Sequence, residues 1–508
     1  MFAAPLLYLL GRNLADPVAA AEALADVDFA GPLVRSLVLA GAVAATATVV
    51  GTGLAWLTTR TDVPLRPLVR MLAPLPLVFP SFVGASALLA GFASGGLLDE
   101  LLSPLGVTGL PSVEGFGGAW LVLTLFTYPY VYLPVAARFA SLSPSLEESA
   151  RLLGHRPGDV FRTVVLPQSS PAIWAGALLV FLYTVSDFGA VQLLKYDTLT
   201  RVIYERRTND RVASLALSLL LGTLAMAVVA GERTMARRRS RIEVARARQA
   251  LPVPLGRWRW PAFLAAAALL VNALLGPVAV LAWWVVRGFN GSGTRLDLPT
   301  EDLLMLSRNT AMVSVTAAVV TVAVILPVAY LTGRYRSRAG TVANAVVVGG
   351  FALPGLVVAL ALVSAAVRAP AGELVYQTIP LLVLGYVVHF GAQAMRASQV
   401  AVAAVPRRLD DAARMLGANR LRRFRSIELP LMRPGLTAGA GLVLLSTMKE
   451  LPTTLLLAPP GFATLSTRIW NAAEGGQLAE TGLTSLLLVA LSGVLTWFFV
   501  IRRAERFD

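Results

Sequence analysis

Residues 411–430 read DAARMLGANRLRRFRSIELP, and residues 147–167 read EESARLLGHRPGDVFRTVVLP. Both stretches are polar and rich in arginine, yet each lies between long hydrophobic runs. Sliding residues 146–194 onto residues 409–457, an offset of 263, gives 19 identities in 49 positions without a gap. Similarity of this kind within one chain predicts that a single structural unit has been used twice.

The composition is that of a membrane protein. Of 508 residues, 56% are hydrophobic and 14% are charged, whereas soluble proteins carry about 25% charged residues. Cysteine is absent and only His155 and His389 occur, which excludes disulfides, thiolate metal sites, cysteine nucleophiles and a histidine cluster for a metal. We therefore expect no metal site and no bound cofactor in this chain.

Apolar runs that approach the roughly 20 residues needed to cross a bilayer predict an all-α polytopic fold of about twelve helices. The predicted spans are 33–58, 68–93, 116–137, 171–194, 212–230, 261–286, 309–332, 343–367, 374–395, 434–457 and 481–501. A further apolar run, 2–11, covers only about 15 Å as a helix. We interpret it as a first helix that lacks its beginning, with a short interfacial segment as the alternative.

The distribution of basic residues predicts the orientation. With an inside amino terminus and twelve crossings, most of the 44 Lys and Arg residues fall in cytoplasmic segments. The outer segment 13–32 is acidic, and 94–115 holds no basic residue. By the positive-inside rule, both termini are cytoplasmic in a multi-pass protein of the cytoplasmic (inner) membrane. The net charge of +15 then reflects topology in a lipid bilayer and not nucleic-acid binding.

An arginine-rich segment at 231–260 reads as a cytoplasmic linker between two halves, 1–230 and 261–508. The repeated polar segments, 144–170 and 407–433, lie between the fourth and fifth helices of each half. The halves are therefore predicted to be parallel pseudo-repeats, with a pore on the axis between them.

Each polar segment has the pattern of a short helix, a turn and a second short helix on the cytoplasmic side. An acidic residue favours the helix start, glycine permits a tight turn at its end, and proline begins a new element. The candidate residues are Glu148, Ala150, Gly154, Leu166 and Pro167 in the first copy and Asp411, Ala413, Gly417, Ile427, Leu429 and Pro430 in the second.

This spacing resembles the EAA loop of permease subunits of binding-protein-dependent ABC importers, which have the MetI-like fold. In that family the loop forms a coupling helix that docks on a cytoplasmic ATPase. The first copy departs from the pattern at Ser149 and Val164, and the second has Asp411 in place of Glu. A basic amphipathic helix resting on lipid headgroups is the alternative interpretation.

The chain carries no phosphate-binding loop of its own. Such a loop needs Gly-Lys-Ser/Thr, but neither Lys195 nor Lys449 follows a glycine. No nucleophile–base–acid arrangement suggests another enzyme activity. The sequence therefore predicts a transport subunit without an ATPase site, and two loops imply two copies of a separate ABC ATPase that hydrolyses the ATP.

Superposing the repeats places Asp187 opposite Glu450, near the outer end of the helix after each loop. Ionisable residues at this depth are candidates for the substrate pathway. The alternatives are structural: Glu450 pairing with Lys449, and Asp187 capping a helix. The remaining pathway candidates, on helices expected to face the pore, are Tyr128, Tyr130 and His389.

Several stretches look like the fused permeases of ferric-iron importers, and this resemblance covers nearly the whole chain. They are LPLVFPSFVGA (75–85), TYPYVYLP (127–134), SDFGA (186–190) and KELPTTLLLAPPGFATLSTRIWNAA (449–473). The resemblance implies an extracytoplasmic binding protein that delivers iron(III), and a permease without a tight metal site. Thiamine is the nearest alternative cargo.

An ion-coupled secondary transporter with two six-helix halves is the alternative of a different class. It would share the predicted spans and the basic linker, but it would have no need of two EAA loops. A channel would need a filter-like motif, and none is visible.

Overall fold

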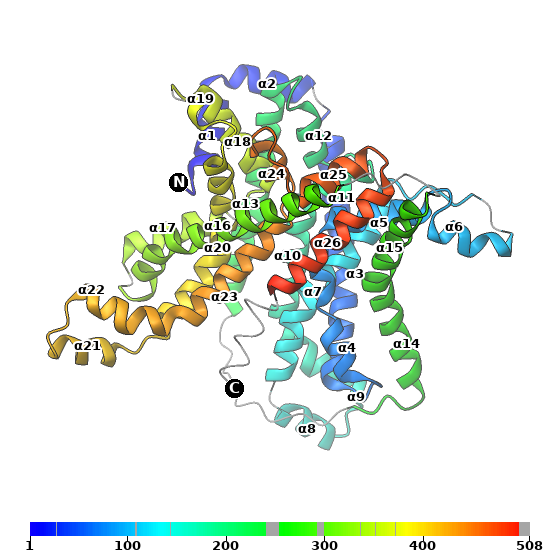
Figure 1. Ribbon diagram of the computed structural model, residues 1–508. Helices are drawn as coiled ribbons and strands as arrows, with labels where there is room; N and C mark the ends of the chain where they lie inside the picture. The colour runs from blue at the N-terminus through cyan, green and yellow to red at the C-terminus, as the bar shows by residue number, and fades with distance from the viewer. Residues whose placement is uncertain are drawn as a thin grey trace. The chain divides into compact units, whose positions relative to one another are not determined.

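The computed structural model describes residues 1–26, 28–106, 109–142, 144–239, 253–291, 299–335, 337–350, 352–370 and 372–496 (Figure 1). Within these ranges the fold is all-α, and the single β contact is an isolated bridge between Thr61 and Val253. The predicted fold class is confirmed.

The chain forms two compact units, each built from separate segments of the sequence. Unit 1 comprises Met1–Asp28, Ile203–Met226 and Leu296–Asp508, and unit 2 comprises Phe29–Val202 and Ala227–Arg295. Thus α1 and the first part of α13 belong with the second half of the sequence, while the helices at 259–289 belong with the first. The two continuous halves predicted from the repeat, 1–230 and 261–508, stay a prediction.

The helices of unit 2 are α3 (Ala30–Arg60), α4 (Arg66–Leu72), α5 (Ser81–Phe92), α6 (Leu97–Leu102), α7 (Phe116–Ser141), α8 (Pro144–Leu152), α9 (Pro157–Val160), α10 (Leu166–Ser186), α11 (Gly189–Leu193), α14 (Arg259–Leu270) and α15 (Gly276–Phe289). Two helices, α12 (Leu199–Arg206) and α13 (Arg211–Arg239), have residues in both units.

The helices of unit 1 are α1 (Ala4–Ala15), α2 (Pro17–Asp26), α16 (Thr300–Gly333), α17 (Arg338–Gly350), α18 (Gly355–Arg368), α19 (Gly372–Val375), α20 (Ile379–Ala403), α21 (Arg407–Met415), α22 (Arg420–Arg423), α23 (Leu429–Met448), α24 (Pro452–Leu457), α25 (Leu465–Glu474) and α26 (Leu478–Thr496).

Each unit has a core of three long helices that correspond through the repeat. In unit 2, α3, α7 and α10 pack together, and in unit 1, α16, α20 and α23 do so. A Cβ atom on Gly176 would lie 2.7 Å from the Cα of Val131, and one on Gly439 would lie 2.9 Å from the Cβ of Ala397. These glycines, 263 residues apart, let the helix after each polar loop approach its neighbour closely, as is typical of membrane helix packing.

Among the described residues, ten helices are long and apolar enough to cross a membrane, or eleven if the bent pair α17 and α18 is one span. The pair bends by 104° between the two helices. The short first run lies in α1, whose 12 residues are too few to cross. The expectation of a polytopic helical membrane protein is confirmed for the described residues.

The predicted continuous helix at 68–93 is wrong in detail, because the chain breaks between α4 and α5. Pro74, Pro76 and Pro80 lie in the break, where they remove backbone donors and prevent a continuous helix. The runs at 171–194 and 434–457 are also interrupted, since α10 ends at Ser186 and α23 ends at Met448.

Helix α13 continues to Arg239, past the predicted start of the linker. Residues 240–252 of that linker lie outside the described part of the chain, as does the end of the run at 481–501.

Candidate functional site

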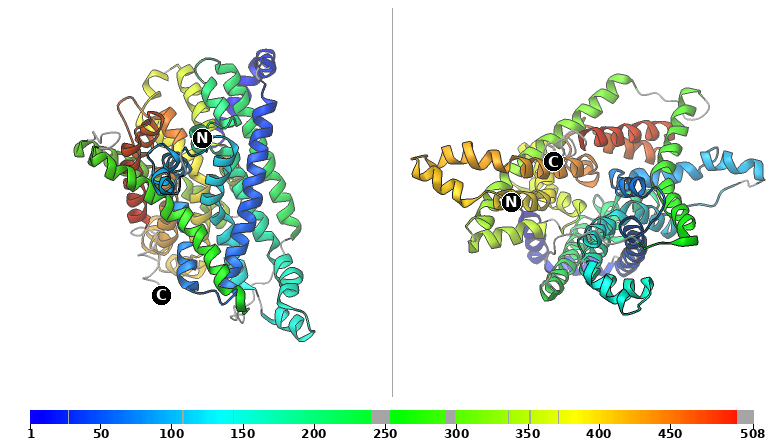
Figure 2. Two further views of the ribbon diagram at one scale, coloured as in Figure 1. Left: turned by 90° about the vertical axis from the view of Figure 1, so that its right-hand side faces the viewer. Right: turned by 90° about the horizontal axis from the view of Figure 1, so that it is seen from below.

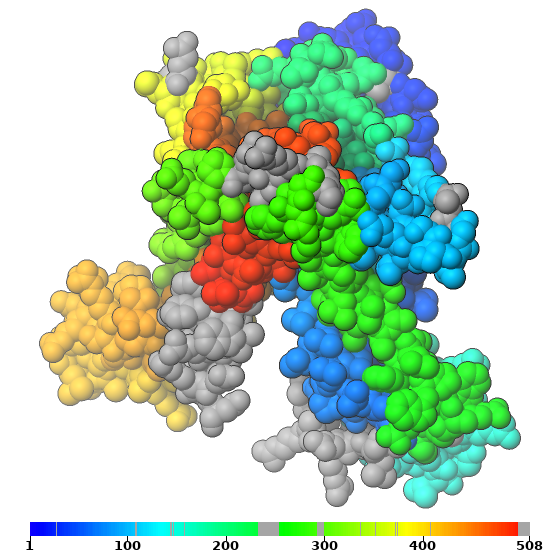
Figure 3. Space-filling model, turned by 45° about the vertical axis from the view of Figure 1, so that its right-hand side comes forward, coloured from blue at the N-terminus to red at the C-terminus, as the bar shows by residue number. Residues whose placement is uncertain are grey.

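The two polar loops fold alike. The space-filling view shows α21 and α22 protruding from the rest of unit 1 (Figure 3), and α8 extends past the ends of the long helices of unit 2 (Figure 2). Helices α8 and α21 end two residues before Gly154 and Gly417, whose φ angles are +85° and +75°. Only glycine adopts this conformation without strain, which explains why both copies have it.

The alanines of the motif accept the bonds that close each turn. His155 N–H donates to the carbonyl of Ala150 at 3.1 Å, and Ala418 N–H donates to that of Ala413 at 3.0 Å. This is the i+5 bond of a Schellman cap, so the helix end is satisfied without a side-chain cap.

The Leu-Pro pair sets the junction with the following long helix. A π-helical turn precedes it in both copies, at Phe161–Val165 and Phe424–Glu428. Leu166 N–H donates to the carbonyl of Phe161 as Leu429 N–H does to that of Phe424. Pro167 and Pro430 have no N–H to donate one turn back, so the wider turn relieves the clash of the proline ring.

An exposed apolar pair stands immediately before each turn. Leu152 and Leu153 are 89% and 80% exposed, and Met415 and Leu416 are 88% and 87% exposed. The pairs correspond at the offset of 263. Apolar side chains held this far into solvent at equivalent places favour contact with a partner.

The first loop is anchored to the end of α3. Arg60 and Glu147 form an ion pair at 2.9 Å, with side chains only 5% and 10% exposed. The guanidinium also donates to the carbonyl of Phe139. The ring of Trp56 packs against that of Phe161, with 5.5 Å between the ring centroids. The loop is therefore attached by a buried charge pair and by ring contacts of Phe161 with Trp56 and with Phe139.

The second loop is anchored to the end of α16 by a larger network. Asp410 pairs with Arg334 at 3.1 Å and with Arg423 at 2.7 Å. Glu428 lies 3.6 Å from Arg334 and accepts a hydrogen bond from the hydroxyl of Tyr330. Desolvation acts to raise the pKa of Asp410, but the two guanidiniums outweigh it and hold that pKa below its ordinary value.

These anchoring residues were not predicted from the sequence. Glu148 and Asp411, the acids of the predicted motif, are exposed, and the acid preceding each makes the buried contact. A signal was present: AWLTTR at 55–60 and AYLTGR at 329–334 repeat at an offset of 274, with Arg60 and Arg334 at their ends.

The carboxylates predicted for the pathway lie at the breaks after α10 and α23. Asp187 accepts hydrogen bonds from the hydroxyl of Ser81 and from Ala190 N–H. Glu450 accepts from the backbone and the hydroxyl of Thr453, at 3.2 and 2.6 Å. Both thereby satisfy backbone donors at the start of the short helix that follows. For Asp187 this is the capping role given as the structural alternative, whereas the pairing of Glu450 with Lys449 stays a prediction.

Each of these carboxylates also lies beside the first residue of a second helix, α5 for Asp187 and α18 for Glu450. Ser81 is the first residue of α5, and a Cβ atom on Gly355, the first residue of α18, would collide with the Glu450 carboxylate. Negative charge is favourable at a helix amino terminus. The pathway role of Asp187 and Glu450 stays a prediction.

The other pathway candidates are dispersed. The Tyr128 hydroxyl donates to the carbonyl of Ala73 in the break before α5, and the Tyr130 ring contacts that of Tyr183 at 5.7 Å. His389 hydrogen-bonds to the backbone of Leu353 and interacts electrostatically with Glu450. Lys449 is the C-cap residue of α23. In unit 1, His389 and Glu450 are thus brought together.

Within the described ranges, no group of three or more His, Cys, Asp or Glu residues could hold a metal ion.

Comparison with known proteins identifies this arrangement. The family model described as binding-protein-dependent transport system inner membrane component matches twice, at residues 38–241 and 325–504. The chain belongs to this family. Both loops of this permease lie within the matched residues, and the two matches correspond to a fused two-half permease.

Relatives of the permease carry several cargo names. An Fe(3+)-transport system permease from Haemophilus influenzae is 31% identical over 75% of this chain and 76% of its own length. A molybdenum transport permease from Mycobacterium bovis is 35% identical over 32% of this chain and 64% of its own. A sulfate transport permease from Salmonella typhimurium is 33% identical over 28% of this chain and 50% of its own.

Proposed function

We propose that this permease is the membrane subunit of an ATP-driven importer that translocates iron(III) delivered by an extracytoplasmic binding protein. The similarity to a ferric-iron permease over three quarters of both chains supports the cargo. The similarities to molybdenum and sulfate permeases cover about a third of this chain or less.

The observation that carries the coupling proposal is the exposed apolar pair at the tip of each loop. An apolar pair inserted into a groove on a partner removes its surface from water, which is the dominant favourable term in association. Two equivalent loops require two equivalent grooves, so the proposed partner is a pair of identical cytoplasmic ATPases. The chain has no Gly-Lys-Ser/Thr motif, so we assign ATP hydrolysis to that partner.

The anchors connect the loops to the long helices, so that a movement of a loop can be transmitted to the core of its unit. When ATP draws the two ATPases together, each docked loop moves with its ATPase. Because Arg60 and Arg334 join the loops to the ends of α3 and α16, this motion is transmitted to the core helices and opens the pathway outward. Hydrolysis reverses it, which gives alternating access.

This assignment requires the loops to face the cytoplasm. The positive-inside distribution supports that orientation, and with twelve crossings both termini would also be cytoplasmic. With the loops inside, the breaks that hold Asp187 and Glu450 lie toward the outer ends of their helices, where cargo would enter.

Uptake by proteoliposomes tests the function. Vesicles that hold the permease and its ATPase would receive ATP, the cognate binding protein and radioactive iron(III), with thiamine, molybdate and sulfate as competing cargoes. We expect ATP-dependent iron uptake. Uptake of another cargo alone would overturn the iron assignment but keep the coupling, and uptake driven by an ion gradient without ATP would overturn both.

A further inference from the structure

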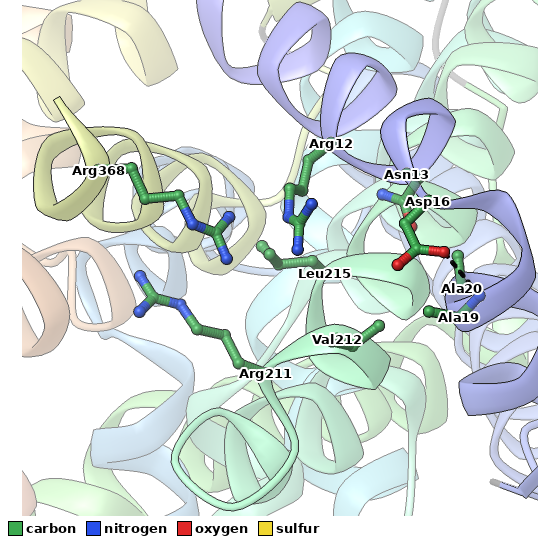
Figure 4. Close-up of a pocket in the computed structure, with 9 residues that line it drawn as sticks. All are labelled: Arg12, Asn13, Asp16, Ala19, Ala20, Arg211, Val212, Leu215 and Arg368. Carbon is green, nitrogen blue, oxygen red and sulfur yellow. Dashed lines mark hydrogen bonds between the residues drawn. The ribbon is translucent and has the colours of Figure 1, made fainter.

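Three arginines from distant parts of the sequence converge on one cavity in unit 1. Arg12 comes from α1, Arg211 from the start of α13 and Arg368 from the end of α18. Figure 4 shows their guanidinium groups directed toward a common space. The convergence depends on tertiary structure, because 156 or more residues separate successive arginines.

The positive charge of this cavity is not neutralised. Among the described residues, no carboxylate forms an ion pair with any of the three arginines, and the cavity is lined by one acid, Asp16. The carboxylate of Asp16 accepts a hydrogen bond from Ala19 N–H. Three guanidiniums and one carboxylate leave a charge of +2 on the lining, and like charges that share a cavity repel.

Neutral hydroxyls hold two of the guanidiniums in place. Arg211 donates to the hydroxyl of Ser364 at 3.1 and 3.3 Å, and Arg368 donates to that of Tyr8 at 3.0 Å. A hydroxyl orients the side chain without cancelling its charge. The remaining donors of each fork are therefore available to a further acceptor.

We propose that this cavity binds a phosphate-type oxyanion, either as a free ion or as the headgroup of a phospholipid. Its volume of about 40 Å³ is several times the roughly 10–15 Å³ that one water requires, which admits a tetrahedral group. Guanidinium forks bind such oxygens in bidentate geometry, and a doubly negative anion offsets the charge of +2.

The location of the cavity is a second reason to expect a bound anion. On the topology proposed above, the cavity faces away from the cytoplasm, since α1, α2 and α18 lie at the top of Figure 1 and α21 and α22 of the same unit lie at the lower left. Clustered arginines on the outer side run against the positive-inside rule. An anion that neutralises them accounts for this departure.

The test uses the purified full-length chain with two probes. Equilibrium dialysis of radioactive inorganic phosphate, with chloride at matched ionic strength, measures the free ion. Native mass spectrometry of the chain purified from membranes counts retained phospholipid. Phosphate binding identifies a free oxyanion, retained phospholipid alone identifies a headgroup, and binding of neither overturns the proposal.

Two sets of variants locate the site. The triple variant Arg12→Gln, Arg211→Gln, Arg368→Gln should bind the wild-type ligand about tenfold or more weakly, because charge-assisted hydrogen bonds are lost. Arg35→Gln is the matched control, since Arg35 is an exposed arginine that pairs with Asp197. If the triple variant and Arg35→Gln weaken anion binding equally, or if neither weakens it, the assignment is overturned.

Asp16→Asn keeps the test decisive if the triple variant fails to fold. Asparagine still accepts the hydrogen bond from Ala19 N–H, so the cap on α2 is retained while one negative charge is removed. We expect severalfold tighter binding of the anion. Binding that does not become tighter would show that the anion lies elsewhere.

Discussion

In the first loop one buried ion pair, Arg60 with Glu147, joins the loop to α3, whereas in the second loop Asp410 is shared between Arg334 and Arg423. Both loops have the same turn, the same π-helical junction and the same exposed apolar tip. The acid and the arginine that anchor them are also equivalent. The two loops therefore share one contact between an acid and an arginine, and they differ in the number of charged residues around it.

The extra polar residues of the second loop occur as a set. Where the second anchor has Tyr330 on α16 and Arg423 and Glu428 in the loop, the first has Trp56 on α3 and Val160 and Val165 in the loop. A buried polar group is costly unless its partners are present, so a partial set would destabilise the anchor. The comparison shows two self-consistent solutions, one with apolar side chains around a single ion pair and one with a network of charged and hydroxyl groups.

The largest expected difference comes from removing the anchoring arginine. Arg60→Gln leaves Glu147 buried without a cation, and we expect a loss of about 3–5 kcal/mol in the free energy of unfolding. Arg334→Gln leaves Asp410 paired with Arg423. It also removes the cation beside Glu428, which keeps the hydrogen bond from Tyr330. Because each acid retains one partner, we expect a smaller loss, about 1–2 kcal/mol. Thermal unfolding in detergent measures both.

The double variant Arg60→Gln, Glu147→Gln is the control, because it removes both charges and should recover most of the lost stability. Equal losses in Arg60→Gln and Arg334→Gln would show that the network of the second loop provides no compensation.

The next effect concerns docking, in which the two loops should behave alike. Leu152→Ala with Leu153→Ala, or Met415→Ala with Leu416→Ala, should each weaken ATPase binding by about 2–4 kcal/mol, as truncation of interface anchors does. Their exposure predicts no loss of folding stability. Co-purification with the ATPase measures the loss.

Leu421→Ala is the matched control, since Leu421 is 57% exposed in the same loop but lies beyond the turn. If ATPase binding survives in both double variants, the tips are not the docking surface.

The sequence was sufficient to predict the repeat, the loops and the membrane fold, because these depend on spacing and hydrophobicity along the chain. Gly154 and Gly417 were predicted correctly as turn residues for that reason. The break at Pro74 was missed because the apolar run continues through it. The anchors were missed because Arg60 and Glu147 are 87 residues apart, and only the fold brings them together.

A smaller effect is expected at the turns. Gly154→Ala and Gly417→Ala meet no neighbouring atom within 4 Å, so their cost comes from the positive φ angle alone, about 1–2 kcal/mol. We expect transport to fall about fivefold to tenfold while membrane insertion is retained. Gly158→Ala is the control, since Gly158 has equal space and no positive φ angle. A similar fall in transport in all three variants would show that the positive φ angle of the turn is not the cause.

The smallest effect is the response of the second anchor to pH. The folded-state pKa of Asp410 lies below its ordinary value of 3.8, so its charge stabilises the anchor above that pH. The contribution is lost only as pH falls through the lowered pKa. Between pH 5 and 8 we therefore expect no change in the mobility of the second loop.

A spin label on Met415→Cys can report this mobility without interference, because the chain has no cysteine of its own. In the added background of Asp410→Asn the label should be mobile at every pH, since the ion pairs with Arg334 and Arg423 are gone. A label that became mobile between pH 6 and 5 in the otherwise unchanged chain would mean that the two arginines do not hold Asp410 ionised. The larger network of the second loop would then be no firmer than the single pair of the first.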